Sequence, residues 1–419
     1  MNLDVSRTAS ARGRTGYMIA GSASEAFRGC GSWSYWRPER RPRKNLRRRC
    51  DRKLGAVRRT TGSTRLLNPT MTDKQSLTPS PVSSDAESGV RSRLAGFWLK
   101  YGNWGALALV FLLASIFSPR DLSTGQNVFL KPDNLIDILR QISEGGILAV
   151  GMTLVVLLAG IDLSVGSVLA LGATLSAVLL LNHHWPAWAV FIVVLMTGAA
   201  AGFLNGAVSV WGRVQPFVVT LAAMTIFRGA ARLLTDGNAL PLESFGHGPG
   251  QVDPVFGILA ERVDGIIPVP VIILLVVVAV CHIWMSRTAI GRHVYAIGGN
   301  RKAAVLSGLP VRRVIIIMYC VCSLLACLAG MIHAAQFQQA SPASDGQGYE
   351  LTAIAATVIG GASLFGGQGT VVGALAGALI MGIIDNFLGI HNVTEHWRLV
   401  IQGLIILAAV LLQRGRDEE

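Results

Sequence analysis

The chain has 419 residues, of which 51% are hydrophobic and only 15% are charged, and its 47 glycines add to the apolar share. Soluble domains carry about 25% charged residues, and the mean hydropathy of +0.49 also differs from theirs. These values indicate an integral membrane protein, and they largely exclude a secreted enzyme or a disordered scaffold.

The net charge of +13 comes from the N-terminal part of the chain. Residues 1–70 carry 15 Arg and 2 Lys against 4 acidic residues, whereas residues 71–419 carry 20 basic and 20 acidic residues. A basic arm for RNA or lipid, an Arg-rich transit peptide and a leader outside the working protein all fit this composition. We favour the disordered leader, expect translation to start at or near Met71, and interpret residues 71–97 as a cytoplasmic polar tail.

Beyond residue 97 the sequence alternates between long apolar runs and short polar loops. A membrane-spanning helix needs about 20 predominantly apolar residues, and the run at 351–365 is short enough to form a half-helix. We therefore predict an all-α polytopic membrane protein with about ten transmembrane helices in a domain at 98–413. The predicted spans are 98–117, 143–160, 165–181, 187–211, 217–233, 268–285, 314–333, 351–365, 369–388 and 396–413.

Two loops give the predicted orientation. Residues 286–313 contain six basic residues and no acidic one, whereas residues 234–267 contain five acidic residues and one basic residue. Basic loops are retained on the cytoplasmic side of a membrane, so we expect 286–313 inside and 234–267 outside. Counting crossings from these loops places both ends of the chain, including the tail at 414–419, in the cytoplasm.

Asp162 is the most informative single residue, because it lies between two apolar runs, where an ionisable group is costly and is a functional candidate. Three roles are open: it caps the following helix with help from Ser164, it accepts hydrogen bonds from a polyhydroxylated solute, or it relays protons. The surrounding Gly160–Gly166 also resembles Gly361–Gly367. Paired glycine-interrupted segments in the two halves of a transporter point to its pathway.

Gly369, Gly373 and Gly377 recur at every fourth position, a spacing that lets helices approach closely in lipid, so we predict a helix-packing seam there. The dipeptide Gly-Lys is absent, which excludes a Walker A phosphate loop. The six cysteines lack metal-ligand spacing. We expect no enzyme activity, no cofactor and no metal site in this chain.

The sequence of the basic loop predicts a short helix within it. Asn300 is a good N-cap, Arg301–Leu306 suits a short amphipathic helix, and Gly308 with the following Pro310 stops it. A loop whose basic residues serve only to fix the membrane orientation needs no such helix. We therefore predict a docking surface for a cytoplasmic partner.

Four stretches together resemble the ribose/xylose-type permeases of bacterial ABC sugar importers. The resemblance covers roughly residues 95–413, with one departure at Ala362, where Thr is common in the family, and it does not cover 1–70. The stretches are Ile147–Met152 with Gly160–Ser167, Val214–Leu221 with Arg228-Gly229, Gly291–Gly308, and Glu350–Ala356 with Gly360–Gly367.

The resemblance implies a homodimeric, multi-pass permease in the bacterial inner membrane, with a lipid bilayer but no nucleic acid as partner. Its further partners are an ABC ATPase on a separate polypeptide, a periplasmic sugar-binding protein and a monosaccharide, of which a ribose-type pentose is our choice. The family's coupling loop corresponds to Arg292, Tyr295, Gly298, Gly299, Asn300, Ala303, Ala304, Ser307 and Gly308. For the translocation pathway we expect Gly160, Asp162, Ser164, Gly166, Asn205, Gln215, Thr220, Ser363 and Asn386.

Three other functions compete with this hypothesis. An ion-coupled sugar symporter needs acidic residues in the membrane, for which Asp162 and Asp385 are the candidates. A branched-chain amino-acid permease of the related importer class has the same architecture. A basic RNA- or lipid-binding membrane protein depends on residues 1–70, and normal function after their deletion excludes it.

Overall fold

The computed structural model describes residues 103–417, apart from 122–124, 243–251 and 264. The predicted leader at 1–70, the start at Met71 and the polar tail at 71–97 lie outside the described residues. The chain divides into two units, 1–81 and 82–419, and everything below concerns the second.

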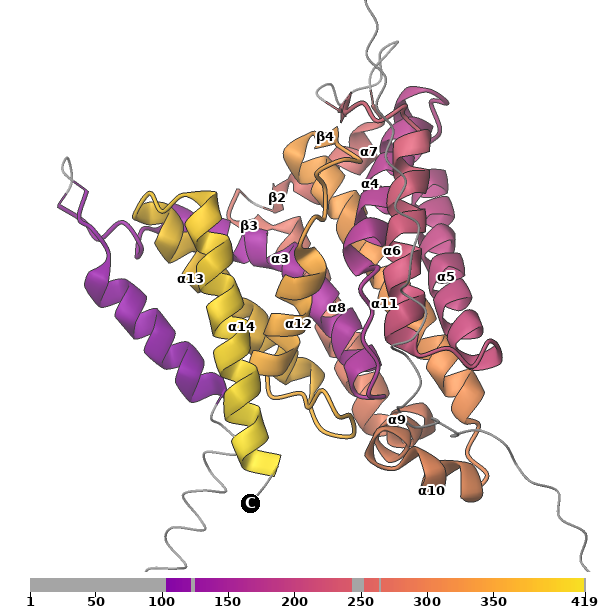
Figure 1. Cartoon of the computed structure of the whole chain (residues 1–419). Helices are drawn as coiled ribbons and strands as arrows, with labels where there is room; N and C mark the ends of the chain where they lie inside the picture. The colour runs from indigo at the N-terminus through magenta and orange to yellow at the C-terminus, as the bar shows by residue number, and fades with distance from the viewer. Residues whose placement is uncertain (1–102, 122–124, 243–251, 264, 418–419) are drawn as a thin grey trace, which may run out of the picture. The chain divides into compact units, whose positions relative to one another are not determined.

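Helices make up almost all of this unit (Figure 1). Two short antiparallel pairs, β1 (Leu240–Pro241) with β4 (Gln339–Ala340) and β2 (Arg262–Val263) with β3 (Ile267–Pro268), are its named strands in the described part. The helices are Asn103–Phe117, α3 (Pro132–Val156), α4 (Val165–Leu181), α5 (Ala187–Trp211), α6 (Pro216–Leu233), α7 (Pro254–Gly257), η1 (Ile258–Ala260), α8 (Val269–Arg287), α9 (Ala289–Gly299), α10 (Arg301–Leu306), α11 (Val311–Phe337), α12 (Tyr349–Ile359), α13 (Val371–Ile390) and α14 (Glu395–Asp417).

The predicted all-α membrane fold is confirmed. Each of the ten predicted spans overlaps a helix in the described residues, and α4 and α5 have the predicted bounds. Within the described residues, α3, α5, α6, α8, α11 and α13 are long and apolar enough to cross a membrane, and Asn103–Phe117, α4 and α12 are shorter apolar helices. The expected tail at 414–419 is helical as far as Asp417, because α14 continues past the apolar run.

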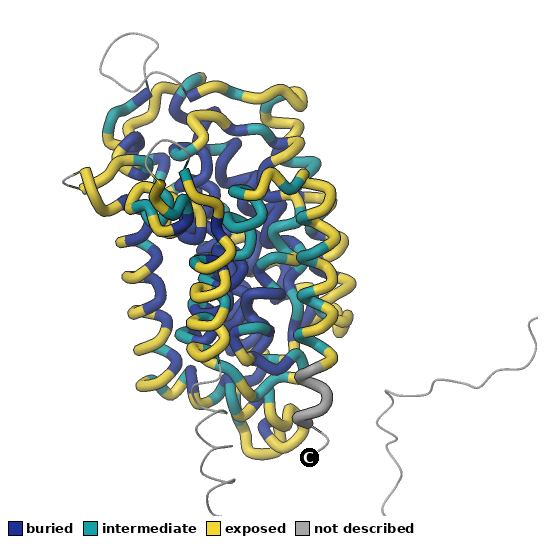
Figure 2. The backbone as a smooth tube through the Cα atoms, turned by 90° about the vertical axis from the view of Figure 1, so that its left-hand side faces the viewer, coloured by how far each residue is buried: buried dark blue, intermediate teal, exposed yellow. Residues whose placement is uncertain are grey.

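The core of the unit surrounds α11, which packs against α3, α4 and α5. Its contact with α5 is especially close along Gly198, Gly202 and Gly206. A Cβ atom at position 202 would lie 2.6 Å from the Cα of Cys320 and closer still to the carbonyl oxygen of Tyr319. Small residues at every fourth position allow such approach in lipid. Figure 2 shows the result, with buried inner segments and exposed residues along the outer helix faces.

A second contact region joins α12 and α13 to α3. Gly373 and Gly377 face α12, and a Cβ at Gly377 would overlap the carbonyl oxygen of Ala356. Gly369 does not share this face, because Thr370 caps α13 by accepting a hydrogen bond from the N–H of Gly373, and the helix begins only at Val371. The three glycines therefore do not form one helical seam.

The two loops that gave the predicted orientation lie at opposite ends of the bundle. The basic loop contains α9 and α10 at one end, and the acidic loop contains α7 and the β2–β3 pair toward the other (Figure 1). Opposite ends are what opposite sides of a membrane require. The assignment of one end to the cytoplasm rests on the charge pattern.

Candidate functional site

Two glycine-rich loops meet at one point of the bundle. The first, residues 157–164, connects α3 to α4, and the second, residues 360–370, connects α12 to α13. The backbone N–H of Gly367 donates to the carbonyl oxygen of Leu157 at 2.9 Å. A Cβ at Gly366 would lie only 2.8 Å from the backbone nitrogen of Ala159. The two loops, which carry the segments that resemble each other in sequence, therefore contact each other through Leu157 and Ala159 of the first, and we call them the paired loops.

Helix α9 packs on both paired loops. A Cβ atom at Gly298 would lie 2.5 Å from the nitrogen of Gly367 and closer still to the carbonyl oxygen of Leu157. The Tyr295 hydroxyl donates to the carbonyl oxygen of Gly369 at 2.9 Å. Burial raises the pKa of this hydroxyl, so it remains a protonated donor. A displacement of α9 must therefore displace both loops or break these contacts.

Asp162 is fully buried inside the first paired loop. Its Oδ1 accepts hydrogen bonds from the Ser164 backbone N–H at 2.9 Å and from the Ser164 hydroxyl at 2.6 Å. Ser164 is the N-cap of α4, and its hydroxyl accepts a bond from Asn205 of α5 at 2.8 Å. Asp162 thus fixes the start of α4 through Ser164 rather than through the first-turn amides. Its Oδ2 and the nearby hydroxyl of Tyr319 are buried without a partner.

Three more predicted pathway residues adjoin this cluster, and three lie elsewhere. Thr220 of α6 donates to the carbonyl oxygen of Ile161 at 3.2 Å, Gly160 lies against the Tyr319 hydroxyl, and Gly166 lies against Gly346. Ser363 is buried in the second paired loop, where its hydroxyl accepts a bond from the N–H of Phe365. Gln215 is exposed at the start of α6, and Asn386 of α13 exchanges hydrogen bonds with Asn134 of α3.

The short helix predicted from the basic loop is confirmed. It is α10, Arg301–Leu306, and the Asn300 side chain caps it by accepting a bond from the N–H of Ala303 at 3.0 Å. Ala304 is its buried residue, and Gly308 ends the segment with φ +76°. Val305 and Leu306 are exposed, Leu306 by 89%. Between Arg292 and Gly308 the other exposed residues are Arg292, Ala296, Gly299, Asn300, Arg301, Lys302, Ala303, Ser307 and Gly308.

A buried polar network was not predicted. Glu144 of α3 holds His333 of α11 through a contact of 2.8 Å between Oε2 and Nδ1, and Nε2 of His333 lies 3.5 Å from Asp345 Oδ1. Arg228 of α6 donates to the carbonyl oxygens of Pro342 and Asp345. Glu144 lies within a predicted span, so its position inside a membrane helix was the available signal.

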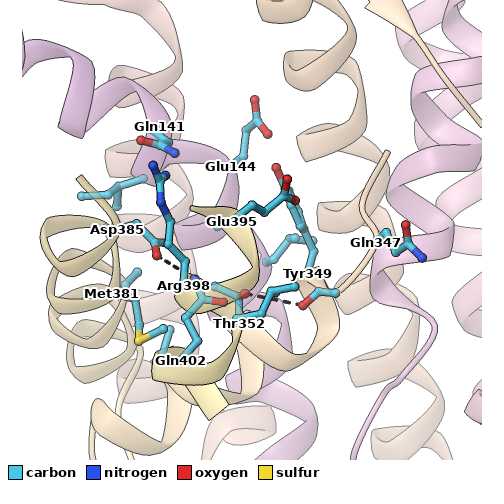
Figure 3. A pocket seen from close by; sticks show the side chains of 18 residues that line it. Gln141, Glu144, Gln347, Tyr349, Thr352, Met381, Asp385, Glu395, Arg398 and Gln402 are labelled. Atoms are coloured by element: carbon cyan, nitrogen blue, oxygen red, sulfur yellow. Dashed lines mark hydrogen bonds between the residues drawn. The ribbon is translucent and has the colours of Figure 1, made fainter. Parts of the chain in front are cut away.

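Glu144 also lines a cavity of about 250 Å³ between α3, α12, α13 and α14 (Figure 3). The wall carries carboxylates, amides and one guanidinium beside apolar side chains, and Gln141, Gln347 and Glu395 are exposed. Gln402 of α14 donates to Asp385 Oδ1 of α13 at 2.7 Å across this space. The labelled lining residues are Gln141, Glu144, Gln347, Tyr349, Thr352, Met381, Asp385, Glu395, Arg398 and Gln402.

The sequence that forms this helix bundle and its paired loops matches a known family. A family model described as "Branched-chain amino acid transport system / permease component" matches residues 134–410. The chain belongs to this permease family. It is therefore a polytopic membrane permease component, as the apolar helices also indicate.

Several permeases named for sugars are similar to this chain over most of its length. The ribose import permease protein of Bacillus subtilis (strain 168) is 39% identical over 327 residues, which cover 78% of this chain and 96% of that protein. The corresponding protein of Escherichia coli (strain K12) is 40% identical over 312 residues, covering 74% and 92%. The D-allose transport system permease protein of Escherichia coli (strain K12) is 36% identical over 333 residues, covering 80% and 97%. No solved structure gives a significant match.

Proposed function

We propose that this chain is the membrane-spanning permease subunit of an ATP-driven importer that moves a monosaccharide, a ribose-type pentose, across the bacterial inner membrane. The contact of α9 with both paired loops carries the proposal. It supplies a mechanical connection between a cytoplasmic surface and the buried Asp162 cluster, which is what an importer with a separate ATPase needs. The sugar assignment is supported by relatives that are named for ribose and allose.

The ATPase docks on α9 and α10 in this proposal. Val305 and Leu306 are exposed apolar side chains on a segment that also carries exposed Arg301 and Lys302. A groove with apolar walls and an acidic rim on the partner complements such a surface. Closure of two ATPase domains pushes α9 against Leu157 and Gly367, and the paired loops then open or narrow the path.

The working assembly in this proposal contains two copies of the permease, two ATPase domains and a periplasmic binding protein that delivers the sugar. Because the binding protein holds the specificity, the permease needs only weak and transient contacts with the solute. Buried hydroxyl, amide and carboxylate groups of the Asp162 cluster offer both donors and acceptors for such contacts.

The second candidate is a branched-chain amino-acid importer, which the description of the matching family model favours. Uptake by proteoliposomes separates the two. The permease is reconstituted with its ATPase and binding protein, and D-ribose, D-xylose and L-leucine are supplied in radiolabelled form. The proposal expects ATP-dependent uptake of a sugar and none of leucine, and uptake of leucine alone contradicts it.

A further inference from the structure

The cavity between α3, α12, α13 and α14 is unlike a packing defect. Gln141, Gln347 and Glu395 of its lining are exposed, so it is a pocket that solvent reaches and not an enclosed void, and its lining holds three carboxylates, three amides and a guanidinium. Ionisable residues within membrane helices are functional candidates by default, and Glu144 and Asp385 lie within predicted spans. Its volume of about 250 Å³ equals that of roughly eight water molecules, which suits a pentose or a hexose.

The chemistry of the wall favours a neutral, polyhydroxylated ligand. Each sugar hydroxyl both donates and accepts a hydrogen bond, and carboxylates accept while amides do both. Glu144, Asp385 and Glu395 outnumber the one cation, Arg398, so an anionic solute is disfavoured. Tyr349 adds an aromatic ring to the same wall.

The side chain of Glu144 is fixed at the edge of the cavity by its contact with His333. Its Oε2 contacts His333 at 2.8 Å, and His333 is in turn held near Asp345, so one oxygen of the carboxylate is fixed. The other oxygen, Oε1, is buried without a partner. Because Oε1 is closed off from the cavity space, Glu144 positions the wall of the cavity through His333 and does not itself offer a free oxygen to a ligand.

Helix α14, the fourth wall of the cavity, packs less extensively on its neighbours than the other three helices do. Helix α14 packs mainly on α12, while α3, α12 and α13 form one packed group. One pair, Gln402 with Asp385, joins α14 to α13 across the cavity, and Arg398 donates to the carbonyl oxygen of Val393 on its own segment. A small displacement of α14 therefore changes access to the cavity without disturbing the core around α11.

We infer that this cavity is a transient monosaccharide site on the translocation path, with α14 as its movable wall. The inference rests on the proposed function. It assigns the sugar contacts to Gln141, Asp385, Arg398 and Gln402, which lie apart from the Asp162 cluster.

Gly145 offers a direct test, because it lines the cavity and a Cβ atom there meets nothing within 4 Å. The variant Gly145→Leu fills the cavity from a helix position that tolerates a side chain. Its matched control is Gly403→Leu, since Gly403 of α14 also has nothing within 4 Å of an added Cβ but lies outside the lining. Both are assayed in the full complex, in proteoliposomes, with D-ribose and D-allose as probes.

Gly145→Leu is expected to reduce sugar uptake by about tenfold or more, the loss expected when contacts with charged groups are removed, with an unchanged melting temperature. Gly403→Leu is expected to match the wild type. If Gly145→Leu does not fold, Gly145→Ala replaces it, and it should reduce D-allose uptake more than D-ribose uptake, because the hexose is larger. Unchanged uptake by the folded Gly145 variant overturns the inference. Absence of any sugar uptake by the wild type instead overturns the proposed function.

Discussion

Gly298→Ala tests the connection between the cytoplasmic surface and the paired loops. The added methyl group would lie 2.5 Å from the nitrogen of Gly367 and closer still to the carbonyl oxygen of Leu157. Both neighbours are backbone atoms that bond to each other at 2.9 Å, so they cannot rotate away as a side chain could. The helix or the loops must shift.

Overpacking of this kind costs about 1–3 kcal/mol, which corresponds to roughly a 5- to 150-fold change in an equilibrium. We expect α9 to separate from the paired loops, so that the ATPase still turns over while sugar uptake per ATP hydrolysed falls by at least about tenfold. The assay measures phosphate release and radiolabelled ribose uptake in the same proteoliposomes.

Two other glycine variants serve as controls for Gly298→Ala. Gly403→Ala adds a methyl group to a helix position that, unlike Gly298, is open, and it should leave the uptake per ATP unchanged. Gly299→Ala adds its methyl group where the chain has nothing within 4 Å, so any effect there reports on the ATPase surface instead. If Gly298→Ala retains wild-type uptake per ATP, the mechanical connection through α9 is refuted.

Three further predictions concern stability and assembly. Asp162→Ala leaves the buried N–H and hydroxyl of Ser164 without an acceptor and should destabilise the detergent-solubilised protein by about 1–3 kcal/mol in thermal unfolding, whereas Asp162→Asn, which keeps an acceptor, should cost less; equal losses contradict this assignment. Gly202→Ala forces α5 away from Tyr319 and should cost about 1–3 kcal/mol, and an unchanged melting temperature would show that the two helices are not in such close contact. Leu306→Asp should change stability by less than about 0.5 kcal/mol, because the side chain is 89% exposed, yet abolish co-purification of the ATPase; normal co-purification places the docking surface elsewhere.

The helices that were predicted best are those in which hydropathy and helix bounds coincide. Helices α4 and α5 are uninterrupted apolar runs between clear stop signals, and their bounds were predicted as they are. Helix α3 begins at Pro132 instead of residue 143, because its first turns carry Asp133, Asp137 and Arg140, which lower the hydropathy without opposing helix formation. Helix α12 ends at Ile359 instead of 365, because the two glycines that follow start a turn.

The candidate sites also divide into features that local sequence predicts and features that depend on tertiary packing. The Asn300 cap and the Arg301–Leu306 helix follow from local chemistry, and the structure has both. The Glu144–His333 contact joins residues 189 positions apart, and no local pattern specifies such a pair. The cavity likewise requires the packing of four helices, which hydropathy does not encode.

The central claim is that ATP hydrolysis by a partner subunit drives sugar through this permease. Orthovanadate and a protonophore, applied to D-ribose uptake in proteoliposomes that contain the complete complex, test it most directly. Orthovanadate should abolish uptake, and the protonophore should leave it unchanged. Uptake that resists orthovanadate and collapses with the protonophore would establish an ion-coupled symporter and contradict the account.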